Sequence, residues 1–183
     1  MFRIASFLIP ILIGSGANAA ELEKIRFAEM PVGLRITVEQ LNGRVFTTTF
    51  LGREGDAYVT EQRVGEGSDG KLISRSTFDL DGQRISTTRA GKTATFTPHE
   101  CTRILGECAY TVKSENGKTV RITMTTSFDE DGEISWRRYV GGREVSSGGF
   151  KVGTHFGWLQ EYTYFVSRSG RRSKGTVINV TAP

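Results

Sequence analysis

Short turn signals punctuate this chain from one end to the other. Most gaps between them are about ten residues, a length that suits single strands and not the helices of βαβ units. Each signal pairs a glycine with a residue that tolerates a left-handed backbone, as a two-residue hairpin turn requires. The clearest are Asn42-Gly43, Asp69-Gly70, Asp81-Gly82, Asn116-Gly117, Asp131-Gly132 and Gly141-Gly142. This punctuation predicts an all-β protein built from consecutive hairpins.

Between the turns, apolar side chains alternate with polar ones. Over residues 120–128, the side chains predicted to face the core are Val120, Ile122, Met124 and Phe128. Counting such segments predicts about 11–13 short strands. A single flat sheet of that width would expose long edges, so we expect an antiparallel up-and-down meander closed into a barrel or barrel-like sandwich.

The first nineteen residues have the features of a secretory signal peptide. Arg3 precedes an apolar run from Ile4 to Ile13, and Ala17-Asn18-Ala19 fits the pattern that signal peptidase cuts. We expect residues 1–19 to be cleaved and residues 20–183 to form one β domain in the periplasm or outside the cell. The apolar run is about half the length of a membrane-spanning helix, so we expect no transmembrane segment.

Two cysteines, Cys101 and Cys108, enclose a six-residue loop. An even number of cysteines in an exported chain predicts a disulfide. Redox-active pairs usually lie two residues apart, so the wider spacing favours a structural bond. A bonded sulfur offers no thiolate, which removes both cysteines as nucleophiles.

Aromatic residues gather near the C-terminus, and two readings of them remain open. They could line a ligand cavity or pack in the core. The candidate ligand-binding residues are Phe156, Trp158, Tyr162, Tyr164 and Phe165. Alternation predicts that Tyr162 and Tyr164 face one way and Phe165 the other.

Basic residues gather just after this aromatic segment. Arg168, Arg171 and Arg172 fall in a predicted turn, where they could contact an anion or simply keep the turn soluble. The whole chain carries a net charge of only +4. Aromatic and basic residues do not interleave as in nucleic-acid-binding modules, so we expect no nucleic-acid partner.

The sequence contains no recognisable catalytic, metal or cofactor motif. The Phe-Asp-x-Asp-Gly segments at 78–82 and 128–132 lack the closing acid of a calcium loop. We therefore expect no metal, no cofactor and no catalytic residue. A hydrolase that uses His99 or His155 stays open as an alternative.

The leading hypothesis is a secreted, non-enzymatic barrel that binds a small apolar or lipid-like ligand. The alternative partner is a protein of the cell envelope, recognised through an exposed strand edge or patch. An outer-membrane barrel fits less well because the strands are short and their polar face carries Arg and Glu. The outline is similar to that of lipocalin-like barrels, whose signature residues have no counterpart here.

Overall fold

The computed structural model describes residues 22–129 and 133–183. Among these residues, twelve antiparallel strands follow a 3₁₀ turn, η1 (Phe27–Glu29). The strands are β1 (Arg35–Gln40), β2 (Val45–Glu54), β3 (Ala57–Val64), β4 (Leu72–Phe78), β5 (Arg84–Arg89), β6 (Lys92–Thr97), β7 (Gly106–Ser114), β8 (Thr119–Phe128), β9 (Ile134–Val140), β10 (Arg143–Val152), β11 (Leu159–Val166) and β12 (Arg171–Thr181). The expected signal peptide, residues 1–19, and the expected Asp131-Gly132 turn lie outside the described residues.

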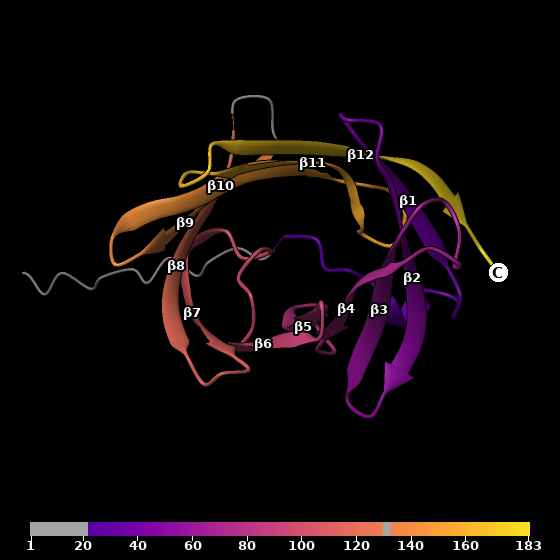
Figure 1. Ribbon diagram of the computed structural model, residues 1–183, viewed down its shortest axis with the longest axis horizontal. Coiled ribbons are helices and arrows are strands. Elements are labelled where there is room, and N and C mark those ends of the chain that lie inside the picture. Colours follow the sequence, from indigo (N-terminus) through magenta and orange to yellow (C-terminus); the bar gives the residue numbers. More distant parts are fainter. Residues whose placement is uncertain (1–21, 130–132) are drawn as a thin grey trace, which may run out of the picture.

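Each strand pairs with its neighbours in sequence, and β1 also pairs with β12. The sheet therefore closes into a barrel (Figure 1). The predicted antiparallel meander is confirmed, and of the two shapes left open the barrel is correct. Closure leaves no unpaired edge strand among the described residues, which removes the aggregation risk that a wide open sheet would carry.

The two ends of the barrel differ in how they are covered. One, which we call the turn end, carries the connections β1–β2, β3–β4, β5–β6, β7–β8, β9–β10 and β11–β12. At the other end, residues 22–34 and the β6–β7 connection, residues 98–105, run inside the ring of strands (Figure 1). We call these two segments the plug. The Leu22 amide donates to the Arg103 carbonyl at 3.1 Å, which ties the two segments together.

The plug supplies much of the core. The Phe27 ring is almost completely buried and lies 4.8 Å from the Phe78 ring and 5.2 Å from the Tyr58 ring, measured between centroids. A second cluster surrounds Met124 and Trp136 on the opposite wall. Burial of one such large apolar side chain contributes about 1.5–3 kcal/mol, so the plug stabilises the barrel as well as closing it.

The predicted alternation holds along most of β8 and is wrong at its end. Met124 is fully buried, and Thr126, two residues on, is buried as well. Phe128, which the pattern placed in the core, is 56% exposed. It is the last residue of β8, so it lies at the rim of the barrel, where its partner Ile134 is the buried member of the pair.

The outer face of the barrel is polar where β2, β3 and β4 meet. Glu61 accepts hydrogen bonds from Arg63 at 3.0 Å and from Arg75 at 3.1 Å. Arg75 also pairs with Glu54. These groups are partly exposed, so each pair contributes little to stability by itself.

Candidate functional site

The barrel is hollow in two adjoining places. The inner cavity, of about 500 Å³, lies against the plug and is bordered by Glu100, Arg103 and Trp158. The outer cavity, of about 650 Å³, reaches the turn end, where Arg44, Lys71 and Ala90 border it. Both cavities share a wall formed by Arg84, Arg89, Tyr162 and Tyr164. The shared wall indicates one continuous interior that opens toward the turn end.

Aromatic rings form one side of the inner cavity. Tyr164 lies 5.6 Å from Trp136, centroid to centroid, across the strand that separates β9 from β11. Gly148 occupies the intervening position, and a Cβ there would come within 2.7 Å of the Trp136 ring. A glycine at this position therefore permits the two rings to meet over bare backbone.

Tyr162 is held from both sides. Its hydroxyl accepts a hydrogen bond from the Gln40 side chain at 3.0 Å. Its ring covers Gly175 on the neighbouring strand β12, where a Cβ would lie 2.5 Å from a ring carbon. The shape of the cavity wall at this point depends on a glycine.

Changing Gly175 to alanine is expected to lower the free energy of unfolding by about 1–2 kcal/mol, because the Tyr162 ring must move and lose its hydrogen bond. Urea denaturation of the variant measures this loss. Gly67→Ala is the control, since a Cβ there meets only one atom, at 3.9 Å. An equal effect of the two changes would show that Tyr162 does not press on Gly175.

A buried ion network lies beside these rings. Glu100, from the β6–β7 connection, is only 2% exposed and accepts hydrogen bonds from Arg84 of β5 and Arg138 of β9. Burial alone would raise the pKa of Glu100, but the two guanidinium charges and the hydrogen bond from Arg84 outweigh it and hold the pKa below its usual value. Glu100 is therefore ionised and pairs with both arginines, which leaves the trio with one net positive charge.

Arg103 has no comparable partner. It is 4% exposed, its Nη1 donates to the Glu23 carbonyl oxygen at 2.5 Å, and its guanidinium lies 5.8 Å from the Phe150 ring centroid. Its Nη2 is buried without a hydrogen-bond partner. Burial lowers the pKa of Arg103 to about 10, although the Glu23 carboxylate acts in the opposite direction. Arg103 is still a cation at neutral pH, and its charge is poorly compensated.

Two other groups near the inner cavity complete its electrostatics. The Nε of Arg138 is also buried without a partner. Burial raises the pKa of Tyr110 to about 12, so this phenol stays neutral and supplies no negative charge. Four arginines and one glutamate border the inner cavity, so its lining is positively charged; they are Arg84, Arg89, Arg103, Arg138 and Glu100.

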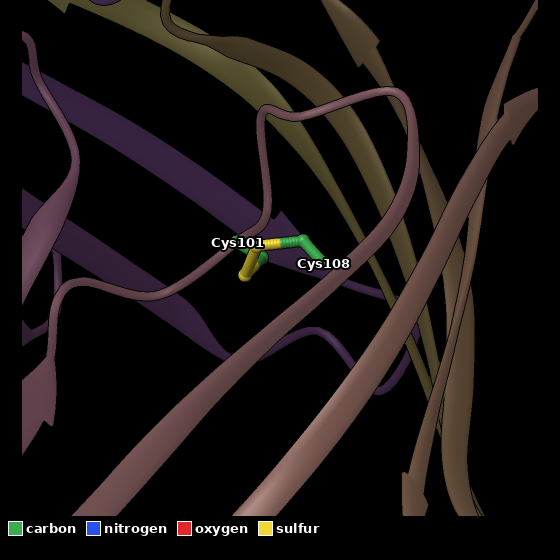
Figure 2. The surroundings of a disulfide bond; sticks show 2 residues. All are labelled: Cys101 and Cys108. Carbon is green, nitrogen blue, oxygen red and sulfur yellow. A yellow bond between two sulfur atoms is a disulfide. The ribbon is translucent and has the colours of Figure 1, made fainter. Parts of the chain in front are cut away.

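A disulfide anchors the loop that carries these charges. Cys101, fully buried in the plug, is bonded to Cys108 on β7, and their Cα atoms lie 5.9 Å apart (Figure 2). Glu100 precedes Cys101 directly, and Arg103 follows two residues later. The bond therefore fixes the wall of the inner cavity to the barrel.

The structure divides the aromatic residues singled out from the sequence. Trp158, Tyr162 and Tyr164 border the inner cavity. Phe156 packs against the cluster around Phe27. Phe165 does not line either cavity and lies 5.5 Å from the Arg172 guanidinium. A ligand-binding role remains a prediction for all five.

The basic residues of the predicted anion contact are also divided. Arg171 borders the outer cavity. Arg168 lies exposed in the connection between β11 and β12, and Arg172 is exposed beside Phe165. Neither His99 nor His155 borders the inner or outer cavity. Their roles likewise remain predictions.

Sequence reasoning missed the buried charges. Arg138 follows Ile134 and Trp136 at every second position of β9, so it occupies the inward phase of that strand. A charged residue at a position where the strand pattern expects an apolar one was the signal that could have revealed this buried charge.

Within residues 22–129 and 133–183, no three His, Cys, Asp or Glu side chains are grouped as metal ligands would be. Over the same residues, no helix has the length and apolar character needed to cross a bilayer.

The fold and the cavities define a class: a closed antiparallel barrel with a hollow, positively charged interior. No family model and no curated protein matches the chain. Among solved structures, a match is a protein of Bacteroides fragilis described as a candidate exported protein with a YmcC-like fold. It is 9% identical, covers 90% of this chain and 100% of its own, and superposes with a TM-score of 0.43. A similarity at this level says nothing about function.

Proposed function

We propose that this protein is an exported, non-enzymatic barrel that binds a small lipid-like ligand in its interior. The observation that carries the proposal is the pair of adjoining cavities inside the closed sheet. Ligand pockets in proteins commonly enclose about 300–1,000 Å³, and each cavity falls within that range. The ligand reaches the inner cavity from the turn end, since the plug covers the other.

The wall of the interior suits an elongated molecule with an apolar body. Trp136, Phe150 and Trp158 border the inner cavity, together with Tyr162 and Tyr164. The charged groups of the same lining come from four arginines and Glu100. In small-molecule sites, apolar and aromatic side chains supply contact area while polar groups fix the orientation of the ligand.

Two features support export. The expected signal peptide would direct the chain out of the cytoplasm. The disulfide between Cys101 and Cys108 is stable in oxidising compartments such as the periplasm and is rare in the cytosol.

The interior can be blocked at a single residue. Thr87 of β5 borders the outer cavity, and its hydroxyl lies 3.1 Å from that of Ser76. Its neighbour Thr88 takes the opposite face of the strand, with its hydroxyl 2.9 Å from that of Thr93. Thr87→Phe is expected to reduce binding of a fluorescent fatty-acid analogue at least about tenfold, whereas Thr88→Phe should leave it unchanged.

The two variants form a matched pair, because they make the same substitution at adjacent, partly buried threonines. Fluorescence titration measures the affinity, and native mass spectrometry of protein purified from the periplasm reports any co-purified ligand. Equal affinities of both variants and the wild type would place the bound analogue outside the barrel. Absence of binding to the wild type, with no co-purified molecule, would contradict the proposed function.

A further inference from the structure

The charges of the interior point to the class of the ligand. We infer that the ligand is an amphipathic anion, an apolar body that carries one carboxylate or phosphate group, and that this group binds at Arg103 in the inner cavity. The inference rests on the proposed function, because it names the chemistry of the molecule that the same cavity takes.

The first observation is the buried charge of Arg103. A guanidinium has five N–H donors, and burying one without a counter-charge is costly. One donor of Arg103 is satisfied by the Glu23 carbonyl oxygen, and Nη2 is buried with no partner. Arg103 is itself one of the residues that line the inner cavity. The Glu23 carboxylate does not replace a bound anion, since its side chain is 55% exposed and lies 3.9 Å from Arg26.

The second observation is the contrast with the neighbouring arginines. Arg84 and Arg138 each pair with the carboxylate of Glu100, so each has an acidic partner within the protein, although one carboxylate offsets only one of the two positive charges. Arg138 also lines the inner cavity, and its Nε is buried without a partner. An anionic oxygen in the cavity would give Arg103 an acidic partner, which Arg84 and Arg138 already have.

The third observation is the path to the cavity. The cationic residues that border the outer cavity are Arg44, Lys71, Arg84, Arg89 and Arg171, and none of the described residues bordering it is acidic. A cleft lined by one sign of charge concentrates ligands of the opposite sign and speeds their association. The aromatic side chains of Trp136 and Phe150, which border the inner cavity, would contact the apolar body of the ligand.

The test compares three probes with the wild-type protein by calorimetry. Decanoate carries a chain and a charge, decanol carries the same chain without a charge, and inorganic phosphate carries a charge without a chain. We expect decanoate to bind at least about tenfold more tightly than decanol, the factor that one charge-assisted hydrogen bond supplies. Phosphate should bind more weakly than decanoate.

Variants then locate the charge. Arg103→Gln should abolish the preference for decanoate over decanol, and Arg103→Lys should retain part of it. Arg121→Gln removes an exposed charge from β8 that borders neither cavity, and it should leave the preference unchanged. Urea unfolding checks that each variant is folded. If Arg103→Gln does not fold, the comparison of decanoate with decanol on the wild-type protein still tests the inference.

The outcomes separate the two proposals. Equal binding of decanoate and decanol to the wild type would overturn the inference and leave the proposed function in place. Phosphate binding as tightly as decanoate would also overturn it, since the apolar body would then contribute nothing. Failure of both decanoate and decanol to bind would count against the proposed function itself.

Discussion

Replacing Glu100 with glutamine should lower the free energy of unfolding by about 3 kcal/mol, the low end of the range for breaking a buried ion pair from one side. The buried carboxylate is shared by Arg84 and Arg138, so its loss leaves both guanidinium groups without their acidic partner. Glutamine has nearly the same shape, so the change isolates charge from packing. Urea denaturation at neutral pH measures the difference.

The outer face provides a matched control. Glu61 also accepts from two arginines, Arg63 and Arg75, but its side chain is 16% exposed, whereas that of Glu100 is 3% exposed. Glu61→Gln should therefore cost at most about 1 kcal/mol, as for other solvent-screened pairs. If both substitutions lower the free energy of unfolding by the same amount, burial does not determine how much the Glu100 network stabilises the protein.

The Glu100 effect should also depend on pH. The folded protein holds the pKa of Glu100 below the ordinary 4.5, so the wild type binds this proton less readily when folded than when unfolded. Its contribution is complete above pH 4.5 and is lost as the pH falls through the lower folded value. The stabilities of the wild type and Glu100→Gln should converge in acid. A gap that stays constant down to complete acid unfolding would contradict this account.

Removing the disulfide is expected to cost about 2–3 kcal/mol, from the chain entropy regained when so small a loop is opened. The double variant Cys101→Ala/Cys108→Ala tests this by urea denaturation. The double variant should also bind the fatty-acid analogue more weakly, because the same loop carries Glu100 and Arg103 to the inner cavity.

Reduction offers an independent check. A phosphine reductant should destabilise the wild type by about the same amount as the double substitution and should leave the double variant unaffected. Unchanged unfolding of the fully reduced wild type would show that packing alone, without the bond, holds the loop in place.

Local sequence rules were enough to predict the antiparallel meander, but they left open whether it forms a barrel or a barrel-like sandwich. A turn signal and a period-two pattern each depend on neighbouring residues, so they could be read without the fold. The same rule predicted that Tyr162 and Tyr164 face one way and Phe165 the other, and Tyr162 and Tyr164 line both cavities whereas Phe165 lines neither. The rule failed at Phe128 because alternation gives the face of a strand but not the depth of a residue along the barrel.

The interior could not be predicted in the same way. Residues 22–34 do not alternate along their length, so no pattern indicated that they enter the barrel. The network at Glu100 joins the β6–β7 connection to β9, and Arg138 lies 38 residues beyond Glu100. Such a pairing depends on how the whole sheet closes. The inward phase of Arg138 was the one local sign that charge lies inside.

The pairing of β1 with β12 has a consequence for when the barrel can close during synthesis. Arg35 lies opposite Thr181, so the seam of the barrel joins strands from opposite ends of the described sequence. Until the last strand has left the ribosome, β1 has only one neighbouring strand and the barrel cannot close. Closure should therefore follow synthesis of β12. A translation product cut short before β12 would expose two raw strand edges and invite association with other copies.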